Sequence, residues 1–323
     1  MQGKISPEQS TESQVYVGID VCKAWLDVFI HPVGRNLRIT NDRNGLKKLK
    51  RELAHYDVAC IVTEATGKYH RQAHRSLHEG GFSVTVVNPI RSRSFAEAFG
   101  ALAKTDAIDA RMLAIMGESL DLQASKLPTQ KMIDLQELFR ARQAVVADAA
   151  ALKNQLGEAQ TTMVKVELKR RIKSAEGSRD RFDAEIMRRI KADPGLARRF
   201  EIVKSIMGVG PVAAMTLVIG MSELGGCTSK QAAMLAGLAP LACDSGAKVG
   251  ERRIRGGRAD VRSGIYMAAV AAARSNPDLK AFFNRLRDAG KPFKKAVAAV
   301  MRKLVVLANA LLREDRLWEP NYA

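Results

Sequence analysis

The sequence predicts an α/β domain, a long helical arm and a second, mainly α-helical domain. Short apolar runs of strand type alternate with helical segments up to about residue 128. A heptad-like apolar repeat follows, and after it come short apolar or Ala-rich helical segments around glycine-rich turns. We therefore expect domains at residues 15–128, 129–193 and 194–323, after a disordered lead-in at residues 1–14.

The composition indicates a globular protein that binds a polyanion. Its 323 residues are 46% hydrophobic, and 52 Lys and Arg against 34 Asp and Glu leave a net charge of +18. Such an excess is typical of nucleic-acid-binding surfaces. An anionic membrane is the second candidate, but the apolar stretches are too short or carry Arg302 and Lys303 inside them, so we expect no membrane span. The polar N-terminal residues contain no secretory signal, which favours a cytoplasmic protein.

The first domain begins with three strand-type segments, at residues 15–20, 25–30 and 35–40. Their tight connections predict an antiparallel meander. Downstream we expect a helix at residues 44–56, a buried strand at 58–64, a helix at 69–79, a strand at 82–87 and a further helix after Lys104. Three strands, helix, strand, helix, strand, helix is the element order of the ribonuclease H-like fold.

Four acids stand where this fold brings its elements together. Asp20 ends the first strand and Glu64 the fourth, and neighbouring central strands would bring both to one sheet edge. Asp106 and Asp109 follow the capping residue Thr105 and share one helical face. Each acid alone is more often an ordinary polar surface group. Together they would repel one another without a cation, so we expect a two-metal site for Mg²⁺, with Mn²⁺ as a substitute, suited to attack on a phosphodiester.

Three histidines, His70, His74 and His78, repeat every fourth residue on one expected helix. The repeat fits a metal-binding stripe or an exposed polar face. We favour the exposed face, because no Cys or acid completes a ligand set at matching spacing.

The arm carries leucines, valines and alanines in a heptad rhythm from Leu135 to Val166, and a similar rhythm continues to Ile190 after a slip. We expect a long helical hairpin or coiled coil with breaks at Gly157 or Gly177. Its apolar stripe must be buried somewhere, which makes a dimerising role plausible.

The second domain opens with a Gly208-Val209-Gly210 turn between two helical segments. Backbone N–H groups in such a turn can approach a nucleic-acid phosphate, as in helix-hairpin-helix modules. A plain tight turn is an equally good interpretation of this short motif.

A basic, glycine-rich stretch begins at Ser245: residues 245–303 contain 15 Lys and Arg against 4 Asp and Glu. A Ser-Gly turn is the ordinary explanation for this serine. No histidine lies in this half, so a nucleophilic Ser245 would need a metal, an Arg or a base from the first domain. Arg and Lys suit phosphate contact, and the candidates are Lys104, Arg111, Lys248, Arg252, Arg253, Arg255 and Arg258.

Taken together, these motifs resemble the Piv-like DEDD transposase and recombinase family of insertion-sequence enzymes. The resemblance covers nearly the whole chain. It rests on Gly18-Ile19-Asp20 with Lys23 and Leu26-Asp27-Val28, Glu64-Ala65-Thr66-Gly67 with Tyr69, Asn88-Pro89, Lys104-Thr105-Asp106 with Asp109 to Ala114, Ile206 to Gly210, Ala236-Gly237-Leu238 with Pro240, and Ser245-Gly246.

The resemblance implies a RuvC-like domain whose DEDD carboxylates are Asp20, Glu64, Asp106 and Asp109. It implies that Ser245 attacks the scissile DNA phosphate and forms a 5′-phosphoserine link. It also implies a noncoding bridge RNA as guide, donor and target DNA as substrates, and a homodimer or homotetramer. The arginine-rich run at residues 251–258 departs from an alignable pattern, so individual phosphate ligands there stay open.

Three other functions fit parts of the sequence. A RuvC-like Holliday-junction nuclease would hydrolyse DNA with the four carboxylates alone, but it leaves the Ser245 region unexplained. An actin-like sugar kinase also opens with a Gly-Ile-Asp motif, but the charge of +18 argues against it. A non-catalytic nucleic-acid-binding protein with degenerate acids is the third.

Overall fold

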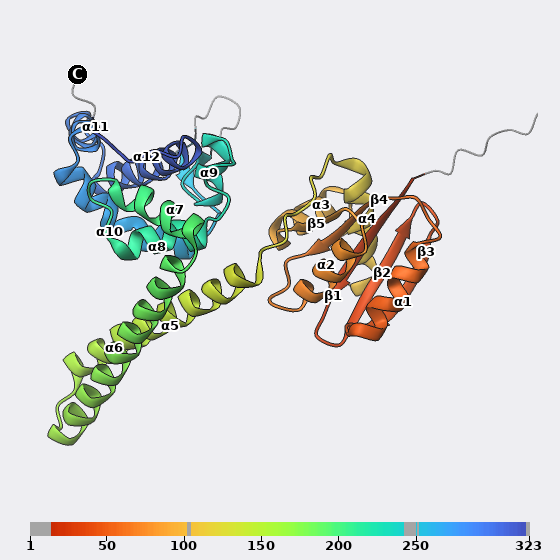
Figure 1. Ribbon diagram of the computed structural model, residues 1–323, viewed down its shortest axis with the longest axis horizontal. Helices are drawn as coiled ribbons and strands as arrows, with labels where there is room; N and C mark the ends of the chain where they lie inside the picture. The colour runs from red at the N-terminus through yellow and green to blue at the C-terminus, as the bar shows by residue number, and fades with distance from the viewer. Residues whose placement is uncertain (1–13, 102–104, 242–249, 251, 321–323) are drawn as a thin grey trace, which may run out of the picture. The chain divides into compact units, whose positions relative to one another are not determined.

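The computed structural model describes residues 14–101, 105–241, 250 and 252–320. Contacts within the chain divide it into two compact units, residues 1–128 and residues 129–323. Figure 1 shows an α/β first unit and a helical second unit that includes the long α5–α6 hairpin. No described helix is both long enough and apolar enough to cross a membrane.

The first unit contains a five-stranded sheet and four helices among its described residues. In order they are β1 (Val15–Val21), β2 (Trp25–His31), β3 (Arg35–Thr40), α1 (Arg43–Leu53), β4 (Val58–Glu64), α2 (His70–Glu79), β5 (Val84–Val87), α3 (Pro89–Ala98) and α4 (Asp106–Ser119). The expected strands and helices of this unit are all present, within a few residues of their expected bounds.

The sheet has the strand order β3-β2-β1-β4-β5. Strand β2 runs antiparallel to β1 and β3, whereas β4 runs parallel to β1 and β5 parallel to β4. Alternate residues of each strand point to opposite faces. Val17, Ile19 and Ile61 therefore join the core beneath α1 and α2, while Val62 packs on the opposite side with Leu113 of α4.

Helix α4 packs unusually close to the sheet because glycine and alanine residues meet where the helix crosses it. A Cβ atom placed on Gly18 of β1 would lie 1.9 Å from the Ala110 carbonyl oxygen and 2.5 Å from the Ala114 nitrogen. One placed on Gly117 would lie 3.0 Å from a methyl group of Val62. Only glycine at position 18 permits this approach, which brings the N-terminal turn of α4 to the end of β1.

Helix α3 was not expected from the sequence. Pro89 occupies its first turn, and the Asn88 side chain caps it by accepting a hydrogen bond of 2.8 Å from the Ile90 amide. Of its residues only Ala96 is buried, so the amphipathic pattern that reveals a helix in sequence is weak here. The sequence did contain one signal for the start of this helix, a capping Asn followed by Pro.

The histidine-bearing helix α2 differs from the expected exposed face. His74 is only 5% exposed and its Nε2 lies 3.2 Å from the Ser125 carbonyl oxygen. The expectation was therefore wrong for His74, because the segment around Ser125 covers this side of α2. Burial lowers the pKa of His74, so its neutral form is favoured.

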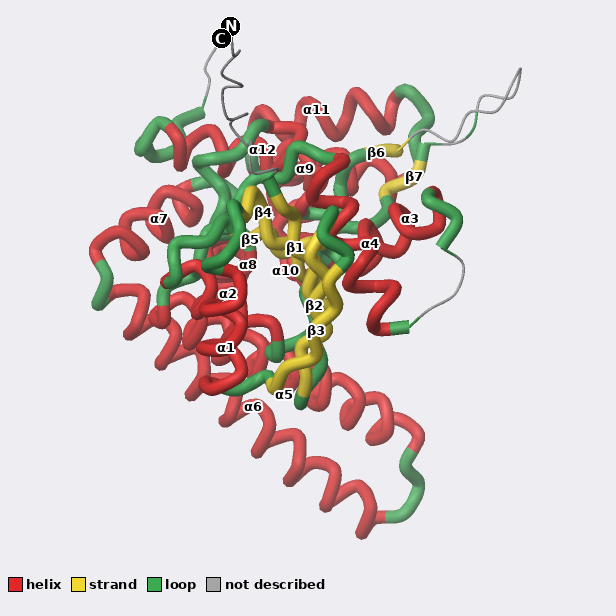
Figure 2. Tube along the Cα trace, turned by 90° about the vertical axis from the view of Figure 1, so that its right-hand side faces the viewer, coloured by secondary structure: helices red, strands yellow, loops and turns green. Residues whose placement is uncertain are grey.

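The second unit is built almost entirely of helices, with the short β6–β7 ladder among them (Figure 2). Its elements are α5 (Gln130–Glu158), α6 (Thr162–Lys191), α7 (Pro194–Ser205), α8 (Pro211–Gly220), α9 (Ser229–Leu235), β6 (Pro240–Leu241), β7 (Arg253–Ile254), α10 (Ala259–Ser275), α11 (Pro277–Asp288) and α12 (Phe293–Arg313). Helix α11 and the two-residue strands were not expected.

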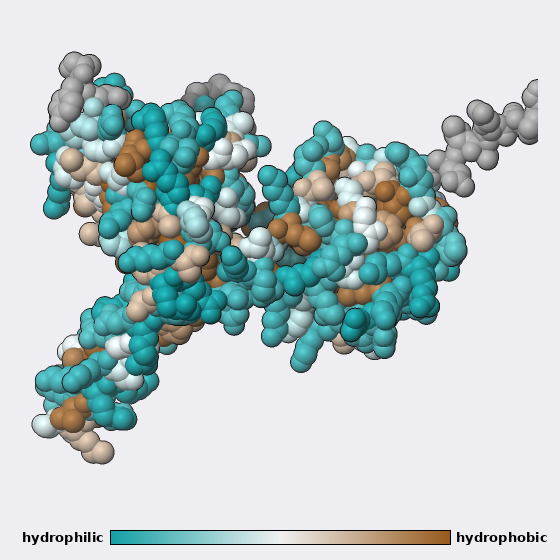
Figure 3. All heavy atoms as spheres, viewed as in Figure 1, coloured by the Kyte–Doolittle hydropathy of each residue, from teal (hydrophilic) through white to brown (hydrophobic). Residues whose placement is uncertain are grey.

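The hairpin turns between Glu158 and Thr162, next to one of the two expected breaks, whereas Gly177 lies inside continuous α6. Its seam is closed by buried Leu152, Leu168 and Ile172. At the tip Met163 is 82% exposed, although the heptad pattern places it in the seam. Figure 3 shows apolar side chains gathered at this end of the hairpin.

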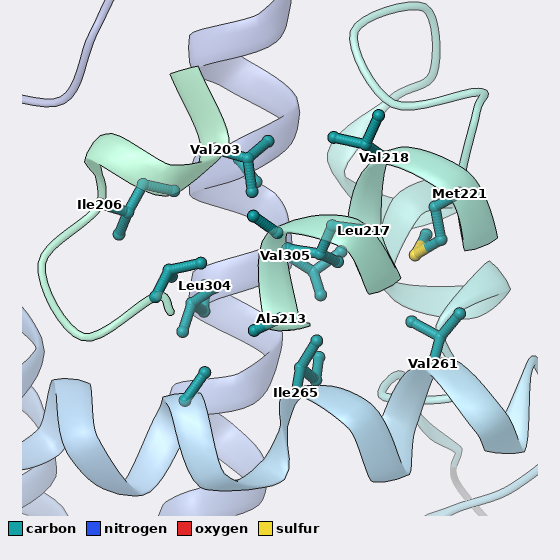
Figure 4. Close-up of a cluster of buried hydrophobic side chains, with 14 of the residues drawn as sticks. Val203, Ile206, Ala213, Leu217, Val218, Met221, Val261, Ile265, Leu304 and Val305 are labelled. Carbon is teal, nitrogen blue, oxygen red and sulfur yellow. The ribbon is translucent and has the colours of Figure 1, made fainter. Parts of the chain in front are cut away.

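The core of the second unit surrounds α8, a helix that is apolar on nearly every side. Figure 4 shows Leu217 of α8 among side chains from α7, α10 and α12, including Val203, Ile265 and Leu304. A short helix buried on all faces cannot form by itself in water, so packing against its neighbours stabilises it.

Candidate functional site

The four predicted acids come from three elements that meet on the α4 face of the first unit. Asp20 is the penultimate residue of β1, and Glu64 is the last residue of β4. These strands are paired neighbours, with Ile19 opposite Thr63. Asp106 and Asp109 occupy the first turn of α4. Strand order and one helix crossing therefore bring together residues that are up to 89 positions apart in sequence.

Asp20 is the electrostatic centre of this group. The pKa of the Asp20 carboxyl is raised from 3.8 to about 6, mainly by burial and in addition by repulsion from Asp106, Asp109 and Glu64. The backbone N–H of Val21 opposes this by donating a hydrogen bond to the carboxylate. Ionising a half-buried carboxyl that three other carboxylates repel costs free energy unless a cation neutralises the group.

The N-terminal turn of α4 is set by its cap. The Thr105 hydroxyl accepts a hydrogen bond of 3.3 Å from the Ile108 amide, as the sequence predicted. Asp106 is exposed, and Asp109 is half-buried. Carboxylates in the first turn also interact favourably with the positive end of the helix dipole. Arg111 is exposed on the same helix, and Lys104 lies outside the described residues.

Glu64 is held by a residue that the sequence analysis did not identify. The Ser92 hydroxyl of α3 lies 2.8 Å from Glu64 Oε1 and 3.0 Å from the Pro89 carbonyl oxygen. Glu64 and Asp109 border a cleft of about 370 Å³ between α3 and α4, which Ile90, Arg93 and Met112 also line. The signal in the sequence was a serine on a helix directly after the strand that pairs with β4.

The donor set fits a hard divalent cation in chemistry, since carboxylate oxygens are the ligands that Mg²⁺ prefers. In the described residues, however, no three His, Cys, Asp or Glu side chains lie close enough together to hold a metal ion. The four acids are thus electrostatically grouped around Asp20 but are not drawn together into a coordination sphere.

The predicted nucleophile, Ser245, lies outside the described residues, as does Lys248. Arg252, Arg253 and Arg255 are exposed on and beside β7. Contact of these three arginines with a nucleic-acid phosphate stays a prediction.

Arg258 has a different environment from its neighbours. Its guanidinium donates to the Glu223 carboxylate at 2.5 and 2.8 Å and to the Gly220 carbonyl oxygen at 2.8 Å. These bonds tie the start of α10 to the end of α8. Arg258 therefore has a structural role, whatever else it contacts.

The two glycines of the predicted phosphate turn also differ. Gly208 has φ +97°, and a Cβ atom there would lie 2.5 Å from the Ala272 Cα of α10. Close packing and backbone conformation thus account for Gly208 fully. Gly210 is the N-cap of α8, and nothing lies within 4 Å of the position of its Cβ.

Two family models match the sequence of the chain. One, described as transposase, matches residues 17–163, and one described as transposase of the IS116/IS110/IS902 family matches residues 200–284. Between them they include the four acids and the Gly208 turn.

The pilin gene-inverting proteins of Moraxella bovis and Moraxella lacunata are each 28% identical to this chain over 315 residues, which is 94% of this chain and 97% of theirs. An insertion element IS900 uncharacterized 42 kDa protein of Mycobacterium paratuberculosis is 30% identical over 127 residues, 38% of this chain and 32% of that protein. By the models that match both of its units and by full-length similarity to gene-inverting proteins, the chain belongs to the IS110 family of DEDD transposases and recombinases, which are DNA strand-transfer enzymes.

Proposed function

We propose that this chain is a metal-dependent site-specific recombinase that cuts and rejoins DNA through a covalent 5′-phosphoserine at Ser245. The observation that carries the metal part is the half-buried Asp20 surrounded by Glu64, Asp106 and Asp109. The sheet order β3-β2-β1-β4-β5, with β2 alone antiparallel to both its neighbours, supports a ribonuclease H-like, RuvC-like first unit.

The four carboxylates are proposed as ligands of two divalent cations, Mg²⁺ in the cell with Mn²⁺ as a substitute. Such cations polarise the scissile phosphate and stabilise charge on the attacking and leaving oxygens. Asp20 and Glu64 would supply ligands from the ends of β1 and β4, and Asp106 and Asp109 would supply them from the first turn of α4. Ser92 orients the Glu64 carboxylate through its hydroxyl.

The serine step conserves the energy of the phosphodiester bond in a serine ester. Ser245 Oγ attacks the phosphorus, its proton passes to a base, and the bond from phosphorus to the 3′ oxygen breaks as that oxygen takes up a proton. A 3′ hydroxyl from the second DNA then attacks the phosphoserine and releases Ser245. Since one phosphate ester replaces another at each step, rejoining needs no external energy.

Two relatives support rejoining over hydrolysis. Both are named for inverting a pilin gene, and inversion requires every broken strand to be resealed. Their similarity spans 94% of this chain, so it includes the Ser245 region as well as the acids.

The partners follow from charge and family. The net charge of +18 suits a complex with donor DNA, target DNA and a noncoding guide RNA. We propose a homodimer or homotetramer, in which carboxylates of one chain act with the serine of another, working in the bacterial cytoplasm where the DNA lies.

A trapping experiment tests the chemistry. Nicked DNA substrates, supplied with the nucleic acid that copurifies with the full chain, are expected to give a covalent protein–DNA adduct in Mg²⁺. Ser245→Ala should abolish the adduct, whereas Ser263→Ala, an exposed serine of α10, should not. Asp106→Ala should abolish cleavage altogether.

Each contrary result has a definite meaning. An adduct that survives Ser245→Ala refutes the serine assignment. Metal-dependent cleavage that yields water-derived ends and no adduct identifies a RuvC-like nuclease instead. Cleavage that survives Asp106→Ala refutes the carboxylate site. Sequencing the copurified nucleic acid tests the guide, because the proposal requires a discrete noncoding RNA.

A further inference from the structure

A fifth carboxylate lies beside the proposed metal ligands. Asp27 of β2 is directly opposite Asp20 of β1 in the antiparallel register, so both side chains point to the α4 face of the sheet. The Asp27 side chain is only 14% exposed. Position and chemistry alone would make Asp27 a metal ligand as readily as its neighbour.

Arg38 occupies both oxygens of Asp27. It stands opposite Asp27 on β3, and its Nε and Nη2 lie 2.7 Å and 3.0 Å from Asp27 Oδ1 and Oδ2. Such a two-point contact between planar groups is strong and directional. A carboxylate whose two oxygens are both engaged by a guanidinium has poor capacity left for a cation.

The same guanidinium reaches a proposed metal ligand. Arg38 Nη2 lies 3.4 Å from Asp106 Oδ2, and the Asp106 side chain is 63% exposed. This single contact between exposed groups is weak compared with the Asp27 contact, so Asp106 can leave while Arg38 stays anchored.

The charges support this division. Four carboxylates carry a charge that two divalent cations balance, and the Asp27–Arg38 pair adds none. Without Arg38, five carboxylates would face the cations. Without Asp27, an uncompensated positive charge would lie beside them.

We propose that Arg38 is a positioning residue that sets the charge and geometry of the metal site. It withdraws Asp27 from the ligand set and contacts Asp106 from β3, and Asp106 would give up this single contact to take part in metal binding. This inference rests on the proposed metal function, and it names two residues outside the four DEDD acids. The result is a site limited to four ligands with one mobile member.

Mn²⁺ binding to the full, metal-free chain tests the proposal, measured by the loss of the free-ion EPR signal. Arg38→Gln, which can still donate a hydrogen bond to one Asp27 oxygen, is expected to tighten Mn²⁺ binding about tenfold because a positive charge leaves and the other Asp27 oxygen is freed. Asp27→Asn, which can still accept from Arg38, is expected to weaken binding about tenfold.

The double variant and a control separate charge from damage. Arg38→Gln combined with Asp27→Asn should return to within about threefold of the parent, since its net charge is the same. The control is Arg35→Gln, which removes another arginine from β3. Arg35 pairs with Glu52 of α1 at 2.7 Å on the other face of the sheet, so this variant should leave Mn²⁺ binding unchanged.

The outcomes are distinct. Weaker binding in both single variants would show that the pair only supports the fold, and unchanged binding in Arg38→Gln would refute the positioning role. Asp20→Asn should abolish the Mn²⁺ binding of the parent. If the parent binds no Mn²⁺, or if Asp20→Asn binds it equally well, the metal site of the proposed function fails together with this inference. Opposite shifts in the single variants support both.

Discussion

Replacing Asp20 with Asn is expected to stabilise the metal-free protein while removing its activity. Burial and neighbouring acids raise the pKa of the Asp20 carboxyl from 3.8 to about 6. The folded protein therefore binds this proton more tightly than the unfolded chain does. Stability falls as the pH rises from 3.8 through about 6, and the loss is complete at neutral pH. Asn carries no charge and avoids this loss.

The size of the effect follows from the pKa. A rise from 3.8 to about 6 corresponds to about 3 kcal/mol for a fully desolvated carboxyl. Asp20 is only half-buried, and solvent screening reduces the expected gain to about 1–2 kcal/mol. In a unit of this size, such a gain raises the melting temperature by about 5 °C.

Scanning calorimetry of the full chain in EDTA measures this gain at pH 8 and at pH 4. Asp20→Asn should melt higher than the parent at pH 8, and most of the difference should disappear at pH 4, where Asp20 of the folded parent is protonated. Added Mg²⁺ should stabilise the parent by about 2.7 kcal/mol at one hundred times its Kd, and the variant much less. Asp57→Asn changes an exposed acid before β4, at the opposite end of that strand from Glu64, and serves as the control.

Two results would refute this reasoning. If Asp20→Asn melts at or below the parent at pH 8 in EDTA, burial and the neighbouring acids do not destabilise the ionised Asp20 carboxylate. If the gain persists at pH 4, it comes from packing of the amide and not from the missing charge.

Three further changes test how the chain builds the site. Gly18→Ala should lower the free energy of unfolding by about 2–3 kcal/mol in chemical denaturation, because its Cβ overlaps α4, whereas Gly157→Ala, with open space around it, should lower nothing. Arg258→Gln should break the pair with Glu223, lower the free energy of unfolding by about 1–2 kcal/mol and so lower the melting temperature. A loss of DNA affinity at an unchanged melting temperature would contradict the structural role of Arg258. Ser92→Ala should weaken Mn²⁺ binding about tenfold in the EPR titration, and unchanged binding would mean that the serine orients nothing.

The first unit was largely predictable because its signals are local. Strand-type runs ending in Asp20 and Glu64, and the Thr105 cap, fix element types and ends through periodicity and capping alone. Helix α3 was missed because only Ala96 of its residues is buried, which leaves little amphipathic pattern to detect. Helix α11 was missed although Leu279, Phe282 and Phe283 form an apolar face that packs against the core.

Individual side-chain roles were harder to predict, because they depend on neighbours distant in sequence. His74 is buried by the segment around Ser125, Arg258 is engaged by Glu223, and Gly208 is required by α10. In each case the residue type fits two roles, and the residue packed against it selects one.

By itself the sequence determined the order of elements, the excess of positive charge and the four acids around which the first unit is organised. The tertiary structure alone decided which carboxylate near Asp20 is engaged by an arginine. Asp27 has the residue type and strand position of a ligand, yet Arg38 from the next strand engages both of its oxygens. Gly18 decides how closely α4 brings Asp106 and Asp109 to Asp20. Charge interactions depend on distance in space, and only the folded chain sets those distances.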